Sequence, residues 1–369
     1  MSQHSAQAEW KTYLTQELSA LAPLFSKYDI ILSPEQPHIK GERFLMQALT
    51  TTGGKKLILV GSYGKNKTPA IIKATRDEAG AKELKHERLC REQLNSFSFA
   101  YDTFLSPTEL LFTEAEGFTI SVQTLIPQES TFLSRSTESQ FDLALRALKA
   151  QELVHATTHH HFSTIKNTFG YKSADDYLEL FKFFIKTATH LDNEDQPTAD
   201  ILSRTYEKLS TQKQDIERYC GFLTHTDFVP HNFRIHDNKM YLLDFSSLRF
   251  GNKHEGWARF LNFMTLYNHD LETALLQYVS DNRAPEEQVS LQLMRLYRLG
   301  EIITYYINTL AQSEGDLHTL NSARVTFWSN VLKYEYAGER VPREIVSSYK
   351  KLRDALRSTE EKERQINLH

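Results

Sequence analysis

The feature of this sequence that most limits its possible folds is a change of pattern near Pro127. Before Pro127, short apolar runs are separated by turn residues, which is typical of antiparallel strands. The segments expected to form strands, with the turn that joins the first two, are 43–52, Gly53-Gly54, 55–64, 69–75, 109–113 and 118–126. One stretch of helical spacing, 79–94, interrupts them. After Pro127 the pattern is mostly helical.

One β-hairpin interrupts the helical part of the chain. Its expected helices are 139–158, 174–218 and 256–312. Between the last two lies a β-hairpin over 233–245, with Asp237-Asn238 as its turn. Strands first and helices second, with one hairpin among the helices, predict an α+β protein of two lobes. The expected parts are a helical extension over 1–30, a small β-rich N-lobe over 31–126 and a larger helical C-lobe over 127–369.

Apolar residues near the start of the chain recur at helical spacing. They are Trp10, Leu14, Leu18, Leu21 and Phe25. An amphipathic helix is therefore expected, and it should end near Pro23 or soon after, because proline lacks the amide hydrogen that a helix interior uses.

The composition argues against several classes of protein. The 369 residues are 40% hydrophobic and 24% charged, which are ordinary values for a globular chain. A formal net charge of −4 provides no overall positive field for nucleic acid or an anionic membrane. No apolar run is long enough to span a bilayer, no secretion signal is recognisable, and the two cysteines suggest no disulfide framework. We therefore expect a soluble, cytoplasmic protein without a nucleic-acid or membrane partner, and its oligomeric state stays open.

Polar residues with an informative spacing surround the expected hairpin, in the stretch HTDFVPHNFRIHDNKMYLLDF over 225–245. Asp227 comes two residues after His225, Asn232 comes five residues after Asp227, and Asp244 ends the second strand. Phosphoryl transfer from a nucleotide needs a carboxylate that orients the attacking hydroxyl, and oxygen ligands for Mg²⁺, a hard cation. These residue types in one stretch predict a phosphotransferase, against the alternative of an acidic turn followed by an ordinary surface hairpin.

The order of these residues, D-x-x-P-x-N over 227–232 and D-F at 244–245, resembles the aminoglycoside phosphotransferase and choline kinase family. The catalytic loop of that family reads H-G-D-x-x-P-x-N, and its metal-binding Asp follows a short hairpin. The resemblance implies a two-lobed protein-kinase-like fold and transfer of the γ-phosphate of ATP to a hydroxyl of a small-molecule acceptor. It also implies that Asp227 is the catalytic base and that Asn232 and Asp244 are ligands of Mg²⁺.

Two further segments fit the nucleotide site that the resemblance implies. Lys73 lies in the apolar strand segment AIIKAT, and in this fold such a lysine binds nucleotide phosphates and pairs with a Glu on the following helix. Glu87 is the expected partner, and Glu83, one helical turn earlier, is the alternative. The segment 117–130 resembles the strand that joins the two lobes. The residues whose peptide groups are then expected at the adenine edge are Gln123, Thr124, Leu125 and Ile126.

The sequence also departs from the family pattern. No G-x-G-x-x-G is present, so the phosphates would be held by Gly53-Gly54 or by Gly61 and Gly64. The family usually has an Asp at a helix start after the metal-binding Asp, where it braces the catalytic loop. Here no Asp occurs over 245–269, and Glu255 is the acidic residue that stands nearest to that role.

The missing brace leaves a second hypothesis open, a catalytically weak pseudokinase that binds nucleotide or serves as a scaffold. Retention of the base, both metal ligands and Lys73 favours an enzyme, because a scaffold has no need for all four. A protein kinase acting on Ser or Thr ranks last, since neither an A-P-E segment nor a long activation loop follows Asp244.

The identity of the acceptor is the least determined feature. Over 270–316 there are three arginines and eight acidic residues, namely Asp270, Glu272, Asp281, Glu286, Glu287, Glu301, Glu314 and Asp316. This balance mildly favours a cationic or neutral polyol acceptor. Solvated helix faces explain it equally well.

Overall fold

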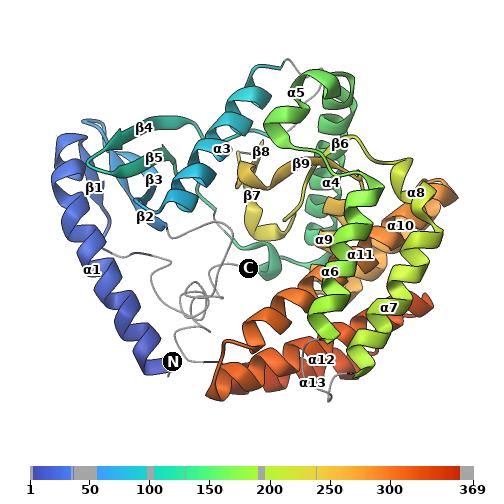
Figure 1. The fold of residues 1–369 in the computed structure, drawn as a ribbon. Helices are drawn as coiled ribbons and strands as arrows, with labels where there is room; N and C mark the ends of the chain where they lie inside the picture. Colours follow the sequence, from blue (N-terminus) through green and yellow to red (C-terminus); the bar gives the residue numbers. More distant parts are fainter. Residues whose placement is uncertain are drawn as a thin grey trace.

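The computed structural model describes residues 3–34, 36, 56–97, 104–128, 130–189, 196–237 and 239–357. Figure 1 shows two lobes: a sheet with a long N-terminal helix, in blue to teal, and a helical assembly, in green to red. The predicted α+β fold of two lobes is therefore confirmed. The expected strand 43–52 and the Gly53-Gly54 turn lie outside the described residues.

The N-lobe is built on a five-stranded antiparallel sheet with the order β1-β2-β3-β5-β4. Its strands are β1 (Ile30–Leu32), β2 (Leu57–Tyr63), β3 (Thr68–Thr75), β4 (Glu109–Ala115) and β5 (Phe118–Thr124). In β3, Ile72 and Ala74 are buried on one face, so Lys73 between them lies on the other face, because side chains alternate along a strand. The helix after β3 is α3 (Glu78–Asn95), whose first turn is capped by the Asp77 side chain.

A long helix, α1 (Gln3–Lys27), packs on this sheet and completes its apolar core. Leu21, Leu24 and Phe25 are buried in one cluster with side chains of the strands. Pro23 lies inside the helix, which ends at Lys27. Burial of the two apolar residues after Pro23 stabilises the last turn, so the helix continues past the proline.

The C-lobe consists of helices around a second apolar core. They are α4 (Thr137–His160), α5 (Phe162–Phe169), α6 (Ala174–Thr189), α7 (Gln196–Thr211), α8 (Lys213–Glu217), α9 (Glu255–Tyr267), α10 (His269–Asn282), α11 (Pro285–Leu310), α12 (Gly315–Ala337) and α13 (Arg343–Leu356). Tyr297 of α11 is fully buried, and Tyr177 of α6 packs edge-on against it, with ring centroids 4.8 Å apart. Among the residues that the structure describes, no helix combines the length and apolarity that a membrane crossing needs.

The expected helix over 256–312 is divided at two places by local chemistry. The Asn268 side chain accepts a hydrogen bond from the Leu271 amide, which caps a new helix, α10. Pro285 then stands at the first turn of α11, where its missing amide hydrogen is not needed. A helical period alone does not reveal such interruptions.

Two short two-stranded sheets lie among these helices and carry the predicted motif. β7 (Phe233–His236) pairs with β8 (Lys239–Leu242), which confirms the predicted hairpin. β6 (Phe222–His225) pairs with β9 (Leu248–Gly251) on either side of that hairpin. The second pairing was not predicted, because its four-residue strands are separated by the whole motif.

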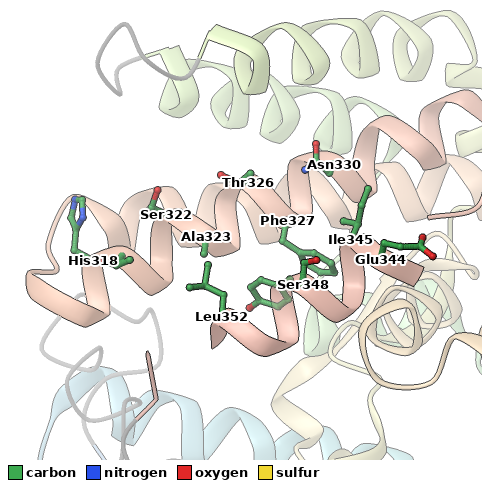
Figure 2. Close-up of a pocket in the computed structure, with 12 residues that line it drawn as sticks. His318, Ser322, Ala323, Thr326, Phe327, Asn330, Glu344, Ile345, Ser348 and Leu352 are labelled. Atoms are coloured by element: carbon green, nitrogen blue, oxygen red, sulfur yellow. The ribbon is translucent and has the colours of Figure 1, made fainter. Parts of the chain in front are cut away.

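The last two helices, α12 and α13, run side by side. Figure 2 shows Leu352 of α13 and Ala323 of α12 facing each other across a groove of about 730 Å³. Phe327 of α12 stacks on Tyr349 of α13, with ring centroids 4.2 Å apart. Aromatic stacking therefore holds the C-terminal helix to the lobe.

Candidate active site

The predicted base and one predicted metal ligand lie in contact. β6 ends at His225, and the chain passes through Asp227 into a short 3-10 turn, Pro230–Asn232. The Asn232 Nδ2 donates to the backbone carbonyl of Asp227 at 2.7 Å and to Asp227 Oδ2 at 2.9 Å. The Asn232 Oδ1 has no hydrogen-bond partner among the described residues. This amide therefore holds the Asp227 carboxylate and keeps its own oxygen for another ligand.

Asp244 is joined to the same turn through the backbone. The Leu243 amide donates to the Asn232 carbonyl at 2.8 Å. The His225 Nε2 donates to the carbonyls of Leu243, at 3.1 Å, and of Asp244, at 3.0 Å. Asp244 has a left-handed backbone, with φ 54°, which side-chain-bearing residues seldom adopt. The fold thus brings Asp227, Asn232 and Asp244 into one contact network, as the spacing predicted.

The Asp244 carboxylate is held by hydroxyl groups. Ser246 donates to Oδ1 at 2.6 Å and Ser247 donates to Oδ2 at 2.7 Å. Burial alone would raise the pKa of Asp244, but His225, the two hydroxyls and Lys73 together lower that pKa. No basic side chain among the described residues forms an ion pair with Asp244. The result is an ionised carboxylate without a protein counter-ion in contact.

Asp227, in contrast, has a positive partner. The Arg259 Nε donates to Asp227 Oδ1 at 2.9 Å, and the His231 Nε2 lies 4.0 Å from Oδ2. Burial alone would raise the pKa of Asp227, but Arg259, His231 and His225 hold it well below the usual range. Arg259 was not among the predicted site residues. It stands on α9, where an arginine in a helical pattern carries no motif, and only the packing of α9 identifies it.

The predicted ion pair of the N-lobe is confirmed. The Lys73 Nζ lies 2.6 Å from both carboxylate oxygens of Glu87, whose side chain is buried. Glu83, the alternative partner, pairs with Lys56 instead. The Glu83 carboxylate also lies 3.4 Å from the Ser246 hydroxyl oxygen, so α3 contacts the segment that holds Asp244.

The segment predicted to meet adenine is partly engaged in the sheet. The amides of Thr124 and Leu125 donate to backbone carbonyls at 2.9 Å each. The Gln123 side chain is buried in the N-lobe. The Ile126 amide forms no hydrogen bond within the described part of the chain. The amides of Thr124 and Leu125 therefore already have partners, whereas the Ile126 amide has none among the described residues.

The glycines suggested for phosphate binding have separate structural roles. A Cβ on Gly61 would lie 2.3 Å from the Ile31 carbonyl oxygen, so Gly61 is required by the close approach of β1 to β2. Gly64 has a φ of +71° in the turn between β2 and β3, with open space around it. The β1 contact accounts for Gly61 without any ligand.

Glu255 occupies the helix start at which the family has an Asp. It opens α9, is fully buried, and accepts hydrogen bonds from Arg249 at 3.0 Å, Arg298 at 3.3 Å and the Tyr177 hydroxyl at 2.6 Å. Burial would raise its pKa, but Arg249, Lys172 and Arg298 lower the pKa of Glu255 from 4.5 to about 2. Arg249 lies in β9, which pairs with β6, so Glu255 ties α9 to the strand that leads into the segment carrying Asp227.

The acidic residues over 270–316 do not form an acceptor site as a group. Four of them are in ion pairs with basic side chains: Asp270 with Arg343, Glu272 with Arg295, Glu287 with Lys253 and Glu301 with Arg298. Ion pairs within the protein thus explain four of the eight acidic residues. The excess of acidic residues over 270–316 is therefore no evidence for a cationic acceptor. The ion-pair partner of Asp227 is the positively charged Arg259.

Neither protein-family models nor curated proteins match this sequence, whereas solved structures match its shape. Aminoglycoside 2′-phosphotransferase-IIIa, solved as a GDP complex, has a TM-score of 0.56 at 11% identity, and the match covers 76% of this chain and 91% of that one. Amicoumacin kinase, solved with AMP-PNP, Ca²⁺ and Ami, has a TM-score of 0.55 at 12% identity. The match covers 92% of this chain and 98% of that one. A thermostable mutant of aminoglycoside phosphotransferase APH(4)-Ia, solved with AMP-PNP and hygromycin B, has a TM-score of 0.54 at 14% identity. The match covers 83% of this chain and 98% of that one. The chain therefore has the two-lobed, protein-kinase-like fold of these small-molecule phosphotransferases.

Proposed function

We propose that this chain is a phosphotransferase that moves the γ-phosphate of ATP to a hydroxyl of a small-molecule acceptor. The observation that carries the proposal is the position of Asn232 between two acids. Its side chain holds the Asp227 carboxylate, and its carbonyl accepts from the amide that precedes Asp244. A base and hard metal ligands held at short range are what phosphoryl transfer requires of a protein.

The nucleotide would lie between the lobes, with its phosphates at Lys73. Glu87 orients the Lys73 ammonium through two contacts of 2.6 Å, and the buried position of Glu87 keeps the pair in place. The Ile126 amide is the hydrogen-bond donor available to adenine. Two of the structurally similar enzymes were solved with AMP-PNP, an analogue of ATP, which supports this assignment.

Mg²⁺ would be held by Asp244 and Asn232. The residues fit the ion, because Asp244 offers a carboxylate without a counter-ion in contact and Asn232 offers an unpartnered amide oxygen among the described residues. Both are hard oxygen donors, which Mg²⁺ prefers. When bound, the ion neutralises charge on the phosphate oxygens. Amicoumacin kinase was solved with Ca²⁺, another hard cation.

Asp227 would receive or orient the acceptor hydroxyl. Asn232 and Arg259 hold one carboxylate oxygen each, so the side chain is fixed before the acceptor arrives. Arg259 also keeps Asp227 ionised, which makes it a weak base and a good positioning group. Hygromycin B and Ami, present in two of the similar enzymes, are small-molecule ligands, in line with a small acceptor here.

The alternative, a nucleotide-binding pseudokinase, rested on the missing Asp after Asp244. That ground is weaker because Glu255 stands at the helix start and is tied to β9 through Arg249.

A turnover test separates the enzyme from the pseudokinase. ATP consumption with Mg²⁺ is measured against a panel of hydroxylated metabolites and antibiotics, for the wild type and Asp227→Asn. We expect the wild type to form a phosphate ester with at least one acceptor. No ester, together with ATP hydrolysis no faster than in the variant, would support the pseudokinase.

A further inference from the structure

The groove between α12 and α13 is lined, within the described part of the chain, by residues of these two helices (Figure 2). Two lining residues, Phe327 and Tyr349, are buried, whereas Leu352 is 43% exposed. Ala323 and Ser348, also in the lining, have small side chains that keep the groove open. An exposed apolar side chain beside such a hollow is typical of interaction surfaces. The groove is therefore suited to a helix of another molecule.

The helix α13 carries an acid and a base that have no ion-pair partner among the described residues. Glu344 and Lys351 are both exposed, and neither forms a salt bridge there. They stand about two helical turns apart, so they share one face of α13. Their neighbour Arg343, in contrast, pairs with Asp270. Glu344 also lines the groove, so these open charges lie beside it.

The two charges are arranged so that this face complements itself. Ser347 and Ser348 lie midway between Glu344 and Lys351, and both serines are exposed. When a second α13 crosses at these serines in the antiparallel direction, each Glu344 faces Lys351 of the partner subunit. Small side chains at the crossing let two helices approach closely. Two identical ion pairs related by a two-fold axis are what a symmetric dimer interface requires.

We propose that the face formed by α12 and α13 binds the same face of a second copy of this chain, as an antiparallel four-helix arrangement about a two-fold axis. The packing covers Leu352 of both copies and joins each Glu344 to Lys351 of the partner subunit. None of these residues belongs to the candidate active site, so the inference does not depend on the proposed function.

The size of this face sets the expected strength of association. At about 10 Å of width each, about 35 Å of α12 and about 21 Å of α13 give about 550 Å² per copy. The total of about 1,100 Å² lies at the lower end of specific interfaces. We therefore expect a dimer that dissociates at micromolar concentration.

Charge reversal combined with sedimentation equilibrium tests the interface. The full chain is measured from about 1 to 200 μM, a range that brackets a micromolar dissociation constant. Glu344→Lys and Lys351→Glu each place like charges opposite one another at two symmetric positions, so each should weaken the dimer about tenfold. The double variant Glu344→Lys/Lys351→Glu restores both pairs and should return to within about threefold of the wild type.

Two further variants complete the experiment. Leu352→Glu places a charge on the apolar rim and should weaken the dimer about tenfold or more. Glu116→Lys is the matched control, because it makes the same charge change at an exposed position between β4 and β5 of the N-lobe and should have no effect. Unchanged circular dichroism and melting temperature check that each variant is folded.

Three outcomes would overturn the proposal. A wild type that stays monomeric up to about 200 μM would exclude self-association of the expected strength. A dimer that is insensitive to the variants on α13 would place its interface elsewhere. Single reversals that weaken the dimer without rescue by the double variant would contradict the antiparallel pairing of Glu344 with Lys351.

Discussion

Asp227 and Asp244 are both carboxylates held by hydrogen bonds, yet their partners differ, in line with the different tasks that we propose for them. Asp227 is paired with Arg259, whereas Asp244 contacts only hydroxyl donors and backbone. Asp227→Asn keeps the shape but loses the base, so turnover should fall about 10²–10⁴-fold with little change in nucleotide affinity. Asp244→Asn removes a charge from the metal site and should weaken binding of Mg²⁺-ATP as well as turnover.

Calorimetric titration with Mg²⁺-AMP-PNP, combined with turnover, separates the two variants. Asp281→Asn is a matched control, since Asp281 is exposed on α10 and loses the same charge. Equal loss of nucleotide affinity in both site variants would contradict the assignment of Asp244 as the metal ligand and Asp227 as the base.

At the scale of elements, Glu255 is the residue at which three helices and a strand meet. It opens α9 and bonds to α6, α11 and β9. Glu255→Gln leaves the half-buried Arg249 without its counter-charge and leaves the buried Arg298 paired with Glu301 alone. Removing one partner of a buried ion pair typically costs about 3–5 kcal/mol of unfolding free energy. Urea unfolding at pH 7 measures this loss. A change below about 1 kcal/mol would show that the pairing contributes little.

The same residue predicts a pH dependence. The pKa of Glu255 is lowered from 4.5 to about 2 in the folded state, so its ionised form stabilises the fold above pH 4.5. That contribution, about 3 kcal/mol by linkage, is lost as pH falls from 4.5 towards 2. Unfolding free energy measured over this range should fall less steeply in Glu255→Gln than in the wild type. Parallel curves would assign the acid sensitivity to other carboxylates.

The helix α1 predicts a second effect at this scale. Leu21 is fully buried between α1 and the sheet, whereas Gln16 on the same helix is exposed. Leu21→Ala should destabilise the protein by about 2–5 kcal/mol through the cavity that it leaves. Gln16→Ala should change the stability by less than about 0.5 kcal/mol. A similar effect of both variants in denaturant unfolding would mean that α1 does not pack on the sheet in solution.

For the whole molecule, the two lobes should respond together to nucleotide. Lys73, which we propose binds the phosphates, belongs to the N-lobe, and Asp244, the proposed metal ligand, belongs to the C-lobe, so Mg²⁺-ATP bound as proposed would contact both. A ligand at a hundredfold excess over its dissociation constant stabilises the native state by about 2.7 kcal/mol. We expect ATP to raise the melting temperature only with Mg²⁺ or Mn²⁺, and Asp244→Ala to abolish the rise. A rise of equal size without metal would argue against Asp244 as the ligand.

The sequence by itself determined those features of the site whose residues lie close together in the chain. Asp227, Asn232 and the hairpin before Asp244 lie within 21 residues, so their spacing and turn chemistry place them together before any other packing is known. The Lys73–Glu87 pair could also be predicted, because the resemblance to the kinase-like fold implies that a lysine of this strand pairs with a Glu of the following helix. The division into two lobes follows from the change of hydrophobic period, which is likewise a local property.

The rest depended on contacts between segments far apart in the chain. Arg259 meets Asp227 only because α9 packs against the loop that carries Asp227, and β6 pairs with β9 only because the hairpin between them folds away. The groove between α12 and α13 likewise exists only because these two helices pack side by side. An amphipathic pattern states which face of a helix is buried but not which partner covers it, since apolar contacts are not directional. Those partners, and the electrostatics and open space that they create, were decided by the tertiary structure.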